Sequence, residues 1–277
     1  MSENVVTLDD GHELFYRVWR PQNRPRAALM VSHGYAEHSG RYGNVGTALT
    51  AAGYVVYAHD QRGHGKSKGM RAHVESRQHL LDDLVSLLSL VREKEGDNIP
   101  VFLLGHSFGS VISVHFAAEY QDELKGLILS GAGIRYGDLS NSQLRQIKVA
   151  WRLAPKKVMT SEFDPSRLSH DQDVISAYKS DPLVFAGSAS LGLLRAMTGL
   201  MESIRKKAAT LRIPVLIQKG GGDVVVLGER ELHDSMTSTQ DKTLKVYEGL
   251  FHEIYNETAD RRKEVLDDLV AWLDKHL

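Results

Sequence analysis

Short apolar runs alternate with longer amphipathic segments along most of this 277-residue chain. Residues 27–32, 54–59, 101–104, 127–129, 215–217 and 244–247 are apolar runs of the length that forms buried strands. Residues 5–8 and 14–20 flank a turn that contains Gly11, which predicts an antiparallel hairpin at the sheet edge. Strands that alternate with helices build βαβ units. The pattern therefore predicts an α/β fold, with a mostly parallel central sheet and helices on both of its faces.

Two helices are clear from apolar residues that recur every three or four positions. One begins near Ser76 and carries Leu80, Leu84, Leu87 and Val91 on a single stripe. The other lies at the C-terminus, where the stripe is formed by Val265, Leu266, Leu269, Val270 and Leu273. We expect both stripes to face the core.

The alternation stops between Gly133 and Ala208, where no convincing strand is found and apolar residues recur in helical register. One stripe comprises Leu193, Leu194, Met197, Leu200, Met201 and Ile204, and a shorter one comprises Ile147, Trp151 and Leu153 before Pro155. We therefore predict that residues 133–208 form a helical cap over the sheet, and that residues 1–132 and 209–277 form the core domain.

The composition restricts the classes of partner and site. The net charge is −1, so no overall field favours nucleic acid or an anionic membrane. The sequence has no cysteine, which excludes disulfides, a cysteine nucleophile and thiolate metal sites. No signal-like or membrane-spanning run is present. We expect a cytoplasmic protein with a small-molecule substrate and no metal or cofactor.

A candidate nucleophile lies in the segment 103–110, LLGHSFGS, between a predicted strand and a predicted helix over 111–120. A G-x-S-x-G turn in this position raises the serine, here Ser107, above the sheet. Gly105 and Gly109 let the strand and helix backbones approach closely. The alternative is a glycine-rich turn with a structural serine.

A serine hydroxyl is a weak nucleophile and needs a base that an acid orients. In folds with this turn, the chain order is serine, acid, histidine. Asp223 follows the strand at 215–217, and His252 follows the strand at 244–247, so both lie at the same sheet edge as Ser107. Glu248 and Asp234 are nearby acids that could replace Asp223 in this role.

The oxyanion of an acyl-transfer reaction needs two N–H donors. We expect them to be the backbone amides of Tyr35, after Gly34, and of Phe108, after the nucleophile. His33 is expected to hold the loop that contains Gly34 and Tyr35 in place. The loop DQRGHGKSKG at 60–69 resembles part of a phosphate-binding loop but lacks its spacing, so nucleotide binding is rejected.

Five motifs in order resemble the monoglyceride lipase and lysophospholipase branch of the α/β-hydrolases, which includes the serine aminopeptidase S33-like enzymes. They are HGYAEHSGRY (33–42), DQRGHGKSKG (60–69), GHSFGS (105–110), DPLV (181–184) and FHEIYNE (251–257). The resemblance implies the α/β-hydrolase fold and the same triad of Ser107, Asp223 and His252. The usual His-Gly pair before the acid is replaced by Lys219-Gly220, and the usual Met after the nucleophile by Phe108.

The resemblance also implies a serine ester hydrolase that acts on monoacylglycerols or related lipids, with a cap that borders the acyl site and contacts membranes transiently. Leu194, Met197, Leu200 and Met201 are candidate acyl-binding residues of the cap, or else simple packing residues. The alternatives are a general carboxylesterase, haloperoxidase-like activity with the same triad, and a non-catalytic binding protein on the same fold.

Overall fold

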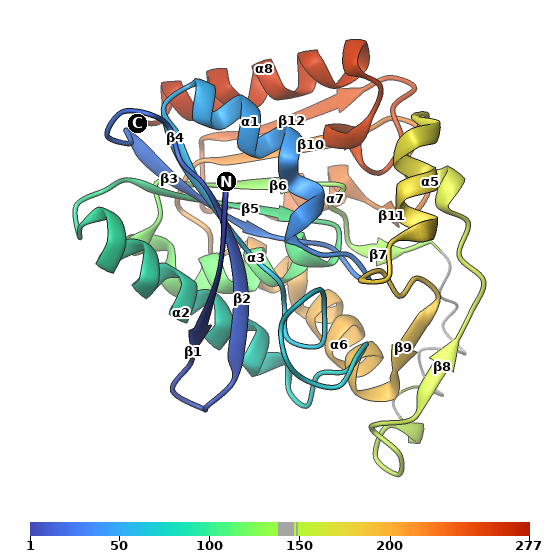
Figure 1. Cartoon of the computed structure of the whole chain (residues 1–277). Helices are drawn as coiled ribbons and strands as arrows, with labels where there is room; N and C mark the ends of the chain where they lie inside the picture. The colour runs from blue at the N-terminus through green and yellow to red at the C-terminus, as the bar shows by residue number, and fades with distance from the viewer. Residues whose placement is uncertain (138–146, 148) are drawn as a thin grey trace.

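The computed structural model describes residues 1–137, 147 and 149–277 (Figure 1). An eight-stranded sheet has the order β1-β2-β4-β3-β5-β6-β10-β12. Its strands are β1 Ser2–Thr7, β2 Glu13–Trp19, β3 Ala27–Ser32, β4 Tyr54–His59, β5 Val101–His106, β6 Gly126–Ser130, β10 Val215–Gly220 and β12 Lys242–Tyr247. Within this eight-stranded sheet only the pairs β1–β2 and β2–β4 are antiparallel, so the predicted edge hairpin and the mostly parallel sheet are confirmed.

Helices cover both faces of this sheet (Figure 1). On one face lie α1 Gly43–Ala51 and α8 Ala259–Lys275, and on the other lie α2 Arg77–Glu95, α3 Phe108–Tyr120, α6 Leu191–Ala208 and α7 Glu229–Ser235. The predicted start of α2 is confirmed, since the Ser76 side chain caps this helix by accepting a hydrogen bond from the Gln78 amide. Short 3-10 helices occur at Ser39–Tyr42, Gln121–Glu123, Pro165–Arg167 and Ile254–Asn256.

Alternation of side chains along the central strands divides the core into two clusters. In β3, Met30 belongs to the cluster beneath α2, α3 and α6, whereas Leu29 belongs to the cluster beneath α1 and α8. Leu103 and Phe102 of β5 are divided in the same way. Such strands are apolar on both faces because neither face meets water. None of the described helices has both the length and the apolar composition needed to cross a bilayer.

The expectation that residues 133–208 contain no strand is wrong. β7 Arg135–Tyr136 pairs with β11 Val226–Leu227, and β8 Val158–Thr160 pairs with β9 Ser188–Ser190. Strands of two or three residues are too short to show an alternating pattern, and their partners are distant in sequence.

The shorter predicted helical stripe, formed by Ile147, Trp151 and Leu153, is wrong at its C-terminal end, because Leu153 is 86% exposed. The segment also includes α5 Gln172–Ser180, at the side of the molecule in Figure 1.

The regular stripe of α6 packs into the core and not onto a separate cap. Met197, Leu200 and Met201 lie in the same buried cluster as residues of α2, α3 and the strands, and Leu194 packs against it. The predicted division of the chain at residue 208 stays a prediction. The packing of α6 favours a cap that ends before Leu191, where this helix begins.

Candidate active site

Ser107 stands on a strained turn between β5 and α3. Its φ is 51° and its ψ is −117°, a conformation that costs energy in a residue with a Cβ atom. The glycines on either side are required by close packing. A Cβ on Gly109 would lie 2.0 Å from the carbonyl oxygen of Ser32, and one on Gly105 would lie 2.5 Å from that of Gly109. The turn therefore has the geometry expected for a raised nucleophile.

His252 and Asp223 meet at the carboxyl ends of the strands. The Nδ1 of His252 lies 2.8 Å from Oδ2 of Asp223, and both residues are buried. Since a carboxylate can only accept at this contact, Nδ1 carries the proton and Nε2 is the proton acceptor of the ring. The alternative acids do not take this place: Asp234 pairs with His233 at 3.0 Å, and Glu248 is exposed.

The Asp223 carboxyl is held in its charged form. Burial raises its pKa, but the contacts with His252 and Lys219 outweigh burial and leave the pKa below its ordinary value. Its Oδ1 also accepts a hydrogen bond of 2.8 Å from the Val225 amide. This acid is therefore fixed in both orientation and charge.

The two amides expected to bind an oxyanion lie beside the nucleophile. Within the described part of the chain, the N–H groups of Tyr35 and Phe108 have no hydrogen-bond acceptor. Gly34 brings the first loop close, because a Cβ on it would lie 3.2 Å from the Cβ of Ser107. The loop is held as predicted by His33, whose Nε2 accepts a hydrogen bond of 2.9 Å from the Gln61 amide.

A cavity of about 40 Å³ is lined by both Ser107 and His252. Its other lining residues are Gly34, Tyr35, Glu37, His106, Phe163, Leu168, Tyr178, Val225 and Glu253. The four α6 residues predicted to bind substrate are not among them. Sequence analysis missed Phe163, Leu168 and Tyr178, because they come from irregular segments and from the short helix α5, without a long periodic stripe.

A buried group of charges borders this cavity. Arg41 forms an ion pair with Glu253, and its Nε lies 3.4 Å from Oε2 of Glu37, while its guanidinium stacks over the Tyr178 ring at 4.7 Å. Burial and the nearby Glu253 raise the pKa of Glu37 to about 7. Glu37 in turn accepts a hydrogen bond of 2.6 Å from the Gly34 amide, which fixes the loop before Tyr35.

His106, which precedes Ser107 in the chain, packs against His252 with the two ring centres 4.8 Å apart. Burial, together with the proximity of His252, lowers the pKa of His106 to about 3, so its ring is neutral near pH 7. His106 therefore adds a polar but uncharged wall to the cavity.

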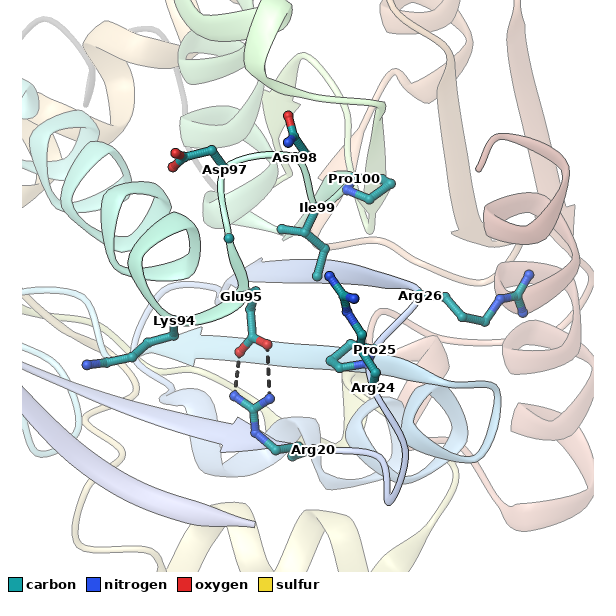
Figure 2. Close-up of a pocket in the computed structure, with 11 residues that line it drawn as sticks. Arg20, Arg24, Pro25, Arg26, Lys94, Glu95, Asp97, Asn98, Ile99 and Pro100 are labelled. Atoms are coloured by element: carbon teal, nitrogen blue, oxygen red, sulfur yellow. Dashed lines mark hydrogen bonds and ion pairs between the residues drawn. The ribbon is translucent and has the colours of Figure 1, made fainter.

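A larger cavity of about 590 Å³ lies at the opposite edge of the sheet, before β3 and β5. Figure 2 shows Arg20 and Glu95 joined there by two hydrogen bonds, one of them 2.9 Å long. Arg26 is likewise paired, with Asp274 at 3.0 Å. Most of the charge in this cavity is compensated, and no nucleophile with a base lies among its lining residues, all of which are described.

Comparison with known proteins assigns the class first. A monoacylglycerol lipase from Paleococcus ferrophilus superposes with a TM-score of 0.85 at 30% sequence identity, covering 95% of this chain and 99% of that one. The predicted α/β-hydrolase fold is therefore confirmed, and the molecule is an α/β-hydrolase.

The family follows from sequence. Residues 23–259 match the model of the serine aminopeptidase S33 family. The monoacylglycerol lipase of Mycolicibacterium smegmatis is 38% identical over 100% of this chain and 98% of its own length. The monoglyceride lipase of Rattus norvegicus is 33% identical over 97% of this chain and 89% of its own length. The chain belongs to this family of α/β-hydrolases, in its monoglyceride lipase branch, as the motifs predicted.

Proposed function

We propose that the chain hydrolyses monoacylglycerols by two-step acyl transfer through Ser107. The relatives named monoacylglycerol or monoglyceride lipase show that the chain is an ester hydrolase of this type, as expected from the sequence. The observation that carries the mechanism is one cavity lined by both Ser107 and His252, with the His252 ring hydrogen-bonded to Asp223. A non-catalytic binding protein would have no need for a strained serine beside an oriented base.

In the first step, His252 takes the proton of Ser107 through Nε2 as the hydroxyl attacks the ester carbonyl. The amides of Tyr35 and Phe108 donate to the oxyanion, and His252 returns the proton to the departing alcohol. An acyl-enzyme remains. In the second step water attacks this ester with the same base, and the fatty acid leaves.

The walls of the cavity suit a ligand with one polar and one apolar end. Phe163, Leu168 and Val225 offer apolar surface for an acyl chain, and Glu37 and Glu253 offer acceptors for hydroxyl groups. A volume of about 40 Å³ holds little more than water. Binding of a monoacylglycerol therefore requires lining side chains, such as Phe163, Leu168 and Tyr178, to move apart.

The test is a Ser107→Ala variant, compared with Ser180→Ala on the exposed face of α5 as a control. We expect Ser107→Ala to lose labelling by a fluorophosphonate probe and to lose ester hydrolysis by about 10⁴-fold or more, with an unchanged melting temperature. Full activity in purified Ser107→Ala protein would refute the mechanism. Higher kcat/KM for monoacylglycerols than for p-nitrophenyl esters of the same acyl chain would distinguish the proposed substrate from those of a general carboxylesterase.

Membrane contact through the cap, expected from the resemblance, is supported by exposed apolar residues within one stretch of the chain, 149–159. Val149, Leu153, Val158 and Met159 are 67%, 86%, 41% and 44% exposed, and Arg152, Lys156 and Lys157 are exposed beside them. Apolar side chains flanked by cations suit an anionic lipid surface. Leu153→Ser with Met159→Ser should reduce co-sedimentation with phosphatidylglycerol vesicles, whereas Val5→Ser on β1 should not. The cytoplasmic location stays a prediction.

A further inference from the structure

A buried lysine contacts the proposed catalytic acid. Lys219 lies at the end of β10, with its side chain only 3% exposed, and its Nζ is 2.5 Å from Oδ2 of Asp223. The same oxygen accepts the 2.8 Å hydrogen bond from His252. Nζ also donates to the carbonyl oxygen of Val226. One carboxylate oxygen is thus shared by the base and by a cation.

This contact cannot be explained as an ordinary surface ion pair. The side chain of Asp223 is fully buried and that of His252 is 4% exposed, so water screens the three groups weakly. A lysine is rarely buried without an anionic partner, because desolvation disfavours its charge. Without Asp223, position 219 would therefore favour an apolar side chain. The buried Lys219 thus depends on Asp223 and belongs to its surroundings.

The cation changes how strongly the acid stabilises a protonated base. An unpaired Asp223 carboxylate attracts the positive ring that forms when His252 takes a proton, and so favours the protonated ring. Lys219 compensates this negative charge and repels the same positive ring. We propose that Lys219 is a positioning residue that acts through Asp223: it holds the carboxylate oxygen that His252 shares and weakens the attraction of that oxygen for a protonated His252 ring. The proposal rests on the triad under the proposed function.

Other charged and titratable groups also face the His252 ring. His106, after β5, packs on the ring, and Glu253 follows it in the chain, paired with Arg41 and close to Glu37. Tyr178 of α5 lies over Arg41. None of these groups is in contact with Lys219 among the interactions of the described residues, so substitution of Lys219 leaves their charges in place.

The test is the pH dependence of kcat/KM for a soluble ester. Lys219→Gln removes the charge and retains an N–H donor, and Lys219→Met removes both the charge and the donor. We expect the pH of half-maximal kcat/KM on the acidic side to rise by about one unit in both variants. Lys245→Met on the neighbouring strand β12 is the matched control, because Lys245 pairs with Asp268 and not with Asp223. It should keep the wild-type profile.

The outcomes separate this inference from the proposed function. If the acidic half-maximum of Lys219→Gln coincides with that of wild type, the charge of Lys219 has no such role and the inference is wrong, although the triad stands. If Lys219→Met does not fold, Lys219→Gln decides alone. If Lys245→Met shifts the profile as much as Lys219→Gln does, the effect is one of net charge and the inference is also wrong. Retained activity in Ser107→Ala, in contrast, would overturn the triad itself.

Discussion

The two edges of the central sheet both carry arginine–glutamate pairs, but the pairs are built differently. At the carboxyl edge, Arg41 binds Glu253 and contacts Glu37, and all three side chains are at most 8% exposed. At the opposite edge, Arg20 binds Glu95 with its guanidinium side chain 48% exposed (Figure 2). Buried charge depends on its partners, whereas exposed charge is screened by water. The comparison indicates that the ion pairs at the carboxyl edge, beside the candidate active site, tolerate substitution less well than those at the opposite edge.

The largest difference between the edges is expected in catalysis. Asp223→Asn removes the negative charge and replaces one of two hydrogen-bond-accepting oxygens with an NH2 group, so the orientation of the His252 ring is lost and kcat should fall by about 10³–10⁴-fold. Glu95→Gln at the opposite edge should leave kcat unchanged. Both variants are compared on the same soluble ester at the pH optimum of the wild type. An Asp223→Asn variant with kcat close to wild type would assign the acid to another residue.

The next difference is expected in stability. Arg41→Met leaves two buried carboxylates without their cation and should lower the free energy of unfolding by about 3–5 kcal/mol. Arg20→Met leaves one carboxylate, Glu95, whose side chain is 4% exposed but still accepts a hydrogen bond from Tyr57, so it should cost less, about 1–2 kcal/mol. Urea unfolding at pH 7.5, followed by circular dichroism, measures both values. Equal losses of unfolding free energy in Arg41→Met and Arg20→Met would contradict the view that the ion pairs at the two edges differ in their contribution to stability.

The smallest effects concern pH, and their signs should be opposite. The pKa of Glu37 is raised to about 7, so its stabilising contribution is complete below the unfolded value near 4.5 and is lost as pH rises through 7. The pKa of Glu95 is lowered: burial raises it, but Arg20 and Tyr57 outweigh burial. Its contribution is present above about pH 4.5 and is lost as pH falls further.

These signs are tested by the difference in unfolding free energy between wild type and each glutamine variant. Relative to Glu37→Gln, the wild type should lose stability between about pH 4.5 and 7. Relative to Glu95→Gln, it should lose stability only below about pH 4.5. A Glu37→Gln difference that is flat across the first range would mean that Glu37 is charged throughout.

The elements predicted well from sequence are those with a continuous or periodic run of apolar residues, such as the strands that are covered by helices on both faces of the sheet. The runs at 27–32 and 54–59 coincide with β3 and β4, because continuous apolar residues of this length fit only buried strands here. The turn at Ser107 was predictable as well, since only glycine fits at positions 105 and 109.

The segment around the cavity was less predictable. Tyr178 and Phe163 line the cavity because of tertiary packing, such as the contact of Tyr178 with Arg41 from the distant 3-10 helix Ser39–Tyr42, and no local periodicity marks such contacts. The α6 stripe misled for the opposite reason: its regular spacing describes a good core helix, and Met197 fills the core. The Lys219 contact could not be foreseen either, because a lysine in a strand is usually read as exposed.

The order of strands has a consequence for the newly made chain. β5 lies in the middle of the sheet, whereas β12, which precedes His252, is the last strand and pairs only with β10 at the outer edge. Synthesis therefore produces Ser107 well before His252, the base proposed for it. A chain that terminates before β12 retains this serine but lacks the proposed base, and we expect it to be inactive.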